Sequence, residues 1–271
     1  MEGELFDVGR SLHAAFPART RNPLRALDQK AMDLASQDAE LRAALFRFVD
    51  VTPACRSLDD LARHLTSYLE DVDDRPQPIE AAMRMSHSKA GRAALGAAAA
   101  AGVRHMAHRF IVGETPRAAL KSIRALWEHG AAVSLDLLGE ATVTSAEADR
   151  YAERCMDALE TLAGAAPGWP DRPILESDSL GPLPRVNLSV KVSALSPLLR
   201  PEAPDVGKED AARRMRPLLT RARDLGAHLH IDMESVDTLE ATTALVFELL
   251  DEPELRDGPS SGVVLQAYLR E

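Results

Sequence analysis

The stretch 186–195 reads VNLSVKVSAL, and its side chains alternate in character. The even positions from 186 to 192 are valine or leucine, whereas the odd positions from 187 to 193 are polar. A period of two is typical of a β-strand with one apolar face and one polar face. Lys191 lies in the middle of the polar face, so the direction of that face decides both the fold and the role of the lysine.

Further segments read as strands, with helical patterns between them along the chain, and those at 131–141, 227–233 and 262–269 repeat the alternation. We predict further strands at RFIVG (109–113), AAVSLDLLGEA (131–141), AHLHIDM (227–233) and GVVLQAYL (262–269). A parallel sheet covered by helices on both faces needs nearly continuous apolar strands. One polar face on successive strands instead favours a (βα)8 barrel, in which the apolar residues face the helices and the polar residues line the mouth of the barrel. The other βα architecture, an open doubly wound sheet with a dinucleotide site, is disfavoured because no G-x-G-x-x-G turn follows a strand.

The first hundred residues have helical periodicity and no strand pattern. Apolar residues recur there at helical spacing: Leu24, Leu27, Leu34, Leu41, Leu45 and Phe48. Ser57 is the predicted N-cap of a helix over SLDDLARHLTSYLEDV, and an Ala-rich helix follows near 90–101. We therefore predict an all-helical, dimerisation-like arm over 1–104 and a barrel region over 105–271.

The composition limits the classes of function. The formal net charge is −10 and no Lys/Arg cluster stands out, which argues against binding to nucleic acid or to an anionic membrane surface. Cys55 and Cys155 lie far apart, without metal-ligand spacing, and no apolar segment reads as a signal peptide or a membrane span. These features predict a soluble, cytoplasmic protein without a disulfide framework.

Polar residues gather at the predicted carboxyl ends of the strands, where (βα)8 barrels carry their active sites. They are Glu140, Lys191, Asp232 and Gln266. Lys191 has two interpretations: a buried ion pair with Asp136 or Asp232, or a cation that holds a substrate carboxylate. His228 and His230 lie on the same strand face as Asp232, which leaves a metal-dependent barrel hydrolase as an alternative.

Taken together, five segments resemble the proline dehydrogenase domain of the proline utilization A family. They occur in the family's order: RFIVGET (109–115), SLDLLGEA (134–141), NLSVKVSAL (187–195), HIDMES (230–235) and VVLQAYL (263–269). The resemblance implies a distorted (βα)8 barrel that binds FAD and oxidises L-proline to Δ1-pyrroline-5-carboxylate, with electrons passing to a membrane quinone. It also implies peripheral membrane contact in the full enzyme and leaves open a homo-oligomer.

The resemblance implies a role for each of the four residues. Lys191 would contact the proline carboxylate, and Glu140 would close the site by pairing with an arginine. Asp232 and Gln266 would lie around the flavin and the substrate, with Gln266 near the isoalloxazine edge. The sequence ends near the expected fifth strand, so we expect an incomplete barrel and little proline oxidation by the isolated chain. A non-catalytic interaction protein that keeps the arm is the third alternative.

Overall fold

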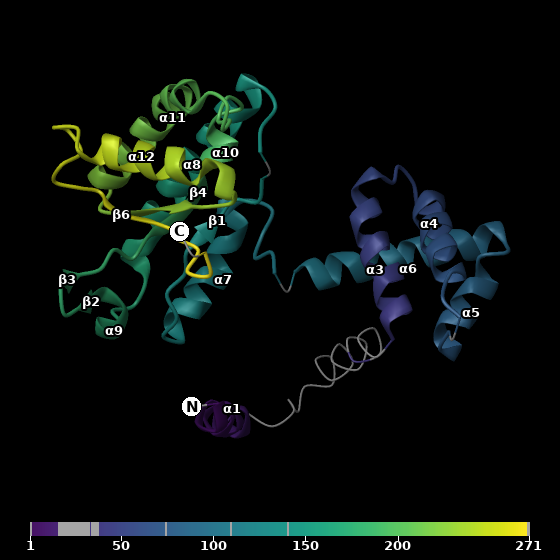
Figure 1. Ribbon diagram of the computed structural model, residues 1–271. Coiled ribbons are helices and arrows are strands. Elements are labelled where there is room, and N and C mark those ends of the chain that lie inside the picture. Colours follow the sequence, from purple (N-terminus) through teal and green to yellow (C-terminus); the bar gives the residue numbers. More distant parts are fainter. Residues whose placement is uncertain are drawn as a thin grey trace. The chain divides into compact units, whose positions relative to one another are not determined.

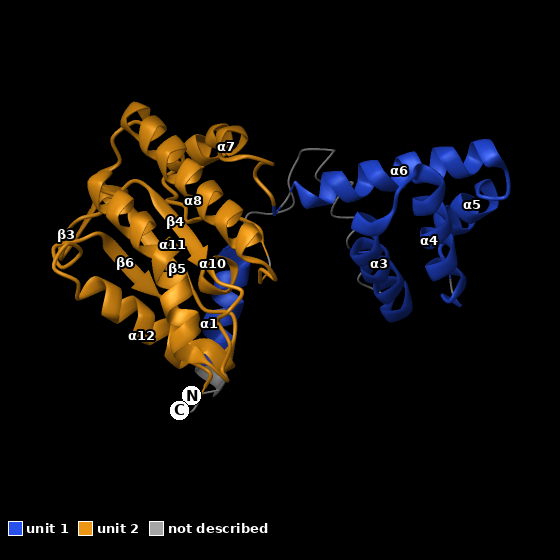
Figure 2. Ribbon diagram, turned by 90° about the horizontal axis from the view of Figure 1, so that it is seen from above, with its two compact units in different colours: residues 1–110 blue, residues 111–271 orange. Residues whose placement is uncertain are grey.

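The computed structural model describes residues 2–15, 33, 38–73, 75–108, 110–139 and 141–269. The chain forms two compact units, unit 1 (residues 1–110) and unit 2 (residues 111–271), which are coloured separately in Figure 2. None of the helices within the described ranges is long and apolar enough to cross a membrane.

Unit 1 is helical, as predicted. Its described elements are α1 (Glu2–Ala15), α3 (Ala39–Val51), the 3-10 turn η1 (Thr52–Ala54), α4 (Leu58–Glu70), α5 (Gln77–Met85) and α6 (Lys89–Ala107). Ser57 caps α4 by accepting a hydrogen bond from the backbone N–H of Asp60, 3.1 Å away. A small core of Leu41, Ala44, Leu69 and Val72 joins α3 to α4 and the segment after it. Leu24, Leu27 and Leu34 of the predicted stripe lie outside the described residues.

Unit 2 alternates helices with strands (Figure 1). Its helical elements are α7 (Pro116–Glu128), α8 (Ser145–Ala165), η2 (Ala166–Gly168), α9 (Pro173–Glu176), α10 (Val192–Leu195), α11 (Pro204–Asp224), η3 (Val236–Thr238) and α12 (Leu239–Leu250). Local signals explain their starts, because Thr115 caps α7 and Thr144 forms a capping box with Glu147 at the start of α8. Gly130, at φ 86°, follows the end of α7, as its sequence position predicts.

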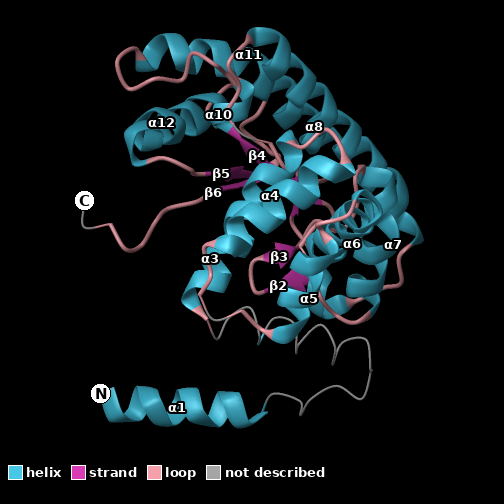
Figure 3. Ribbon diagram, turned by 90° about the vertical axis from the view of Figure 1, so that its right-hand side faces the viewer, coloured by secondary structure: helices cyan, strands magenta, loops and turns pink. Residues whose placement is uncertain are grey.

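The main sheet has four parallel strands: β1 (Leu135–Asp136), β4 (Asn187–Lys191), β5 (His228–Asp232) and β6 (Ser260–Val263). Their spatial order, β1-β4-β5-β6, is also their chain order. Each strand lies beside the strand that precedes it in the chain, so right-handed connections place all the connecting helices on the same face of the sheet. This arrangement is that of an incomplete (βα)8 barrel preceded by a helical arm, which confirms the predicted fold class. A short hairpin, β2 (Ser177–Asp178) with β3 (Gly181–Pro182), lies outside the main sheet (Figure 3).

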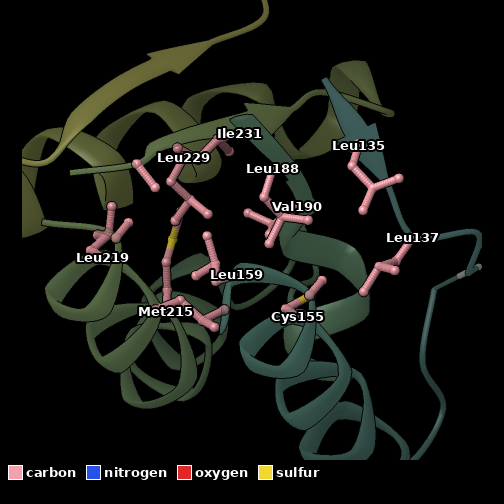
Figure 4. Packing of buried hydrophobic residues seen from close by; sticks show 14 of the residues in the cluster. Leu135, Leu137, Cys155, Leu159, Leu188, Val190, Met215, Leu219, Leu229 and Ile231 are labelled. Carbon is pink, nitrogen blue, oxygen red and sulfur yellow. The ribbon is translucent and has the colours of Figure 1, made fainter. Parts of the chain in front are cut away.

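The apolar face of the sheet packs against α8 and α11. Leu188, Val190, Leu229 and Ile231 are fully buried there. Figure 4 shows these side chains together with Leu159 of α8 and Met215 of α11. The period of two in the sequence thus separates a helix-covered apolar face from a polar face.

Several predicted element bounds are wrong. Residues 110–113 form no strand, and within the described ranges no strand pairs with the outer edge of β1. Phe110 is 83% exposed. The predicted strand over 131–141 shortens to β1, where only two residues pair with β4. The predicted strand over 186–195 ends at Lys191, after which the chain turns into α10.

The last predicted strand, 262–269, is also too long. β6 ends at Val263, and one more ladder-like bond runs from the N–H of Val264 to the carbonyl of Ile231. Because β5 ends at Asp232, residues 265–269 have no strand to pair with within the described part of the chain. Gln266 and Tyr268 therefore lie in irregular and turn structure, not on a strand face.

Candidate active site

Lys191 is the last residue of β4, and its register partner on β5 is Asp232. On the other side of β4, Asp136 ends β1 opposite Ser189. Parallel strands end at the same edge of a sheet, so this register brings one cation and two carboxylates together. These three residues therefore lie at the carboxyl ends of their strands, the edge at which (βα)8 barrels carry their active sites.

The ammonium of Lys191 is enclosed by carboxylates. Its Nζ lies 2.9 and 3.0 Å from the two carboxylate oxygens of Asp136 and 3.2 Å from Oδ2 of Asp232. Oε1 of Glu234 is 3.9 Å away. The lysine side chain is 9% exposed, whereas the three acidic side chains are 34–39% exposed. The ion pair anticipated from the sequence is thus present with both aspartates, and the four ionised groups together carry a net charge of −2.

Two opposing effects act on the pKa of Lys191. Burial lowers the pKa because it disfavours the charged form, but hydrogen bonds to Asp136 and Asp232 and the charges of these residues outweigh burial. The net effect raises the pKa of Lys191 above its ordinary value. The lysine is therefore a permanent cation at neutral pH, suited to holding an anion and unsuited to acting as a general base.

The turn after Lys191 is fixed by a second polar network. Arg214 of α11 donates to the carbonyl of Leu195 at 3.1 Å and to Oδ2 of Asp210 at 3.0 Å. Asp210, 3% exposed, also accepts from the hydroxyl of Ser196 at 2.7 Å. These bonds anchor the end of α10 to α11, so the segment that follows Lys191 is held on a rigid helix.

Gln266 lies beside the loop that follows β5. Its Nε2 donates to the carbonyl of Met233 at 2.9 Å, which orients the side-chain amide. The Oε1 atom is buried and has no hydrogen-bond partner among the described residues. A buried acceptor without a donor carries a free-energy cost, so this oxygen suits a ligand N–H or O–H. Glu140 lies outside the described residues.

The histidine pair does not form a metal centre with its neighbours. His228 and His230 stack on each other with ring centroids 5.8 Å apart, and Nδ1 of His228 lies 2.8 Å from the hydroxyl of Ser260. Within the described ranges, no group of three or more His, Cys, Asp or Glu residues is placed to hold a metal ion.

Sequence reasoning missed two residues of this site. Glu234 follows β5 and accepts a hydrogen bond from the hydroxyl of Ser193, which ties α10 to the loop after β5. Tyr151, buried in α8, accepts a hydrogen bond from the backbone N–H of Lys191 at 3.2 Å. Glu234 follows His228, His230 and Asp232 at the same spacing of two residues, which is a signal that the sequence did contain. No sequence pattern marks Tyr151, because its contact depends on how α8 is rotated against the sheet.

Comparison with known protein families matches both parts of the chain. The family model described as "Proline dehydrogenase" matches residues 119–271, more than half of the sequence. The chain belongs to the proline dehydrogenase family. The model described as "Proline utilization A N-terminal domain" matches residues 2–110. The resemblance inferred from the five motifs is therefore confirmed.

Individual relatives agree with this assignment. The chain is 36% identical over 166 residues to the bifunctional protein PutA of Salmonella typhimurium, across 61% of this chain and 12% of that protein. It is 28% identical over 172 residues to proline dehydrogenase 1 of Bacillus subtilis subsp. natto, across 64% of this chain and 47% of that protein. The chain thus spans about an eighth of the first relative and just under half of the second.

A solved structure matches nearly the whole chain. The crystal structure of proline utilization A from Bdellovibrio bacteriovorus, inactivated by N-propargylglycine, superimposes with a TM-score of 0.81 and 28% sequence identity. The match covers 99% of this chain and 26% of that one. The fold of both units is therefore that of the corresponding part of a proline utilization A protein.

Proposed function

We propose that unit 2 takes part in the FAD-dependent oxidation of L-proline to Δ1-pyrroline-5-carboxylate, the first step of proline catabolism. The observation that carries the proposal is the placement of Lys191 between Asp136 and Asp232 at the carboxyl ends of three neighbouring parallel strands. A zwitterionic amino acid needs a cation for its carboxylate and anions for its amine, and this site offers both.

Lys191 is the residue we propose to hold the substrate carboxylate. The Nζ of Lys191 contacts three aspartate oxygens, but two of these belong to the same carboxylate, that of Asp136. One N–H for each aspartate keeps both ion pairs, so the third N–H of the ammonium can bind a substrate oxygen. The charge-assisted bond that replaces it is of the same kind, so the exchange costs little.

The acidic groups are the proposed partners of the substrate amine. Asp136, Asp232 and Glu234 are each about one-third exposed, so they remain reachable from outside. Together with Lys191, these three carboxylates carry a net charge of −2, which attracts a cationic amine more strongly than an anionic ligand. The amine must pass its proton to one of these carboxylates or to water before the neighbouring C–H bond can break as a hydride. The same carboxylates then stabilise the positive charge that grows on the nitrogen.

Gln266 and Asp232 are the residues we propose to hold FAD. The buried, unpaired Oε1 of Gln266 is the observation that fits a flavin, whose ring system carries an N–H donor. Bound FAD would supply the hydride acceptor; the protein residues position the substrate beside it.

Following the family resemblance, we also propose that Glu140 closes the site through an ion pair with an arginine. We further propose that a quinone accepts the electrons and that the protein assembles as a homo-oligomer.

The proposal is tested by adding FAD to the purified 271-residue chain and recording flavin absorbance after gel filtration. We expect FAD to co-elute with the chain. We expect Gln266→Leu to weaken FAD binding about tenfold, as the loss of one hydrogen bond does. Gln77→Leu is the matched control, because Gln77 is exposed on α5 of unit 1. Absence of bound FAD at a large excess of free FAD would refute the proposal.

Substrate recognition is tested separately from turnover. L-Proline is titrated into the FAD-loaded chain, and the concentration that half-saturates the change in flavin absorbance is recorded. We expect Lys191→Met to raise this concentration at least tenfold while FAD remains bound. An unchanged concentration would show that Lys191 does not hold the carboxylate.

A further inference from the structure

The backbone N–H of Lys191 has a partner outside the sheet. On the β1 side of β4, the ladder stops at the pair Asp136–Ser189, two residues before Lys191. The N–H of Lys191 instead donates to the hydroxyl oxygen of Tyr151, 3.2 Å away on α8. A side chain from the helix layer thus continues the hydrogen bonding of β4 where its neighbouring strand has ended.

Tyr151 is itself held firmly. It is 4% exposed and lies in the second turn of α8, whose first turn is fixed by the capping box of Thr144 and Glu147. Its hydroxyl lies close enough to the thiol of Cys155, one turn later in the same helix, for the two groups to affect each other's pKa. Because the hydroxyl oxygen accepts from Lys191, its single proton is available to donate to that thiol. On the other side, the tyrosine ring lies 3.5 Å from the position that a Cβ on Gly139 would occupy.

The hydroxyl has no packing role that phenylalanine could not fill. Phenylalanine at this position would occupy the same ring volume within the apolar cluster that includes Cys155. What the hydroxyl adds is an acceptor for the one amide of Lys191, a residue that is 8% exposed and would otherwise bury an unpaired N–H. The tyrosine therefore serves the geometry of the strand end.

We propose that Tyr151 is a positioning residue that fixes the end of β4, and with it the Lys191 ammonium between Asp136 and Asp232, in the place from which it grips a substrate carboxylate. The inference rests on the proposed function, since it assigns Lys191 a carboxylate ligand. It adds a residue that touches neither substrate nor cofactor and acts through the backbone of Lys191. Its effect is specific to carboxylate-bearing ligands.

The test is Tyr151→Phe, with Tyr68→Phe in unit 1 as the matched control. The first readout is the hydrogen exchange of the Lys191 amide in a chain labelled with ¹⁵N-lysine, which has few signals to resolve. We expect exchange at Lys191 to accelerate at least tenfold in Tyr151→Phe and to stay unchanged in Tyr68→Phe. Equal exchange rates at Lys191 in the wild type and Tyr151→Phe would overturn the inference.

The second readout separates positioning from general destabilisation. L-Proline and pyrrolidine, which lacks the carboxylate, are compared through the concentration that half-saturates the flavin absorbance change. We expect Tyr151→Phe to raise this concentration about tenfold for L-proline, which corresponds to the loss of one hydrogen bond between Lys191 and the carboxylate. For pyrrolidine, the concentration should change by no more than about twofold. An equal change for both ligands would assign Tyr151 a purely structural role and overturn the inference.

Two further outcomes remain decisive. If the wild-type chain binds neither L-proline nor pyrrolidine, the proposed function is wrong. Hydrogen exchange of the Lys191 amide then determines by itself whether Tyr151 fixes the end of β4. If Tyr151→Phe does not fold, the wild type labelled with ¹³Cζ-tyrosine is compared in H₂O and D₂O. A slowly exchanging hydroxyl on Tyr151, and on neither of the other two tyrosines, supports the inference, and its absence overturns it.

Discussion

Lys191 and Asp232 are register partners on β4 and β5, and the Nζ of the lysine lies 3.2 Å from Oδ2 of the aspartate. The same Nζ lies 2.9 Å from Oδ2 of Asp136 at the end of β1. One ammonium therefore joins the ends of three neighbouring strands. It also neutralises part of a carboxylate cluster that would otherwise repel itself, so the residue proposed for substrate binding also stabilises the fold.

Replacing Lys191 by methionine removes the ammonium and its charge but keeps an unbranched side chain that is only one atom shorter. We expect the free energy of unfolding of unit 2 to fall by about 1–3 kcal/mol, less than for a fully buried pair because the acidic partners are one-third exposed. Urea unfolding is followed by the fluorescence of Trp127 and Trp169, which lie in unit 2 with ring centroids 5.4 Å apart. Lys121→Met, on an exposed position of α7, is the control. Equal stabilities of Lys191→Met and the wild type would contradict this role.

Burial of Cys155 predicts a loss of stability in alkaline solution. Burial raises the pKa of the Cys155 thiol to about 12, whereas the unfolded chain releases this proton near its ordinary value of about 9. Between these two values the unfolded state binds fewer protons than the folded state, so stability falls as pH rises, by about 1.4 kcal/mol per pH unit for this group. The raised pKa values of Tyr151 and Lys191 act in the same direction.

The pH dependence is measured by urea unfolding of unit 2 between pH 8 and pH 11. We expect Cys155→Ala to reduce the slope of stability against pH above pH 9, although it lowers stability at pH 8 by removing a buried side chain. Cys55→Ala should keep the wild-type slope, because Cys55 is only half-buried and lies in unit 1. Identical slopes for Cys155→Ala and the wild type would show that the thiol does not contribute.

The two free cysteines should differ in chemical reactivity. Thiolates are the reactive form, and Cys155 is fully buried with a strongly raised pKa, whereas Cys55 is partly exposed. We expect a maleimide to label Cys55 in the native chain at least a hundred times faster than Cys155, with both residues labelled in urea. Mass spectrometry of the digested protein measures each rate, and rapid native labelling at Cys155 would disagree with the packing of α8.

The alternation that was readable in the sequence predicted the strands that lie in the middle of the sheet. β4 and β5 each have partners on both sides, and the face on which Leu188 and Leu229 lie packs against helices. At such positions the alternating side chains predict a strand, and neighbouring strands on both sides supply its hydrogen bonds. The predicted strand at 109–113 and the extension to 269 failed, because apolar residues alone do not show whether a partner strand continues beside them.

The candidate site was predictable only in part for a related reason. Lys191 and Asp232 stand at strand ends, where parallel topology brings polar residues together without further information. Gln266 is near the site although its strand was predicted wrongly, because its amide binds the carbonyl of Met233. Tyr151 reaches Lys191 across 40 residues of sequence, and only the packing of α8 on the sheet determines that contact.

The crossing of α4 and α6 in unit 1 predicts opposite effects for two glycines of the same helix. A Cβ on Gly96 would lie 2.0 Å from the carbonyl oxygen of Leu58, whereas a Cβ on Gly102 would meet no described atom within 4 Å. We expect Gly96→Ala to destabilise unit 1 by about 1–3 kcal/mol, because the two helix backbones must separate. Gly102→Ala should stabilise it by up to about 1 kcal/mol through helix propensity. Hydrogen exchange of peptides from α4 and α6 measures both changes, and two variants that moved protection in the same direction would contradict the close crossing at Gly96.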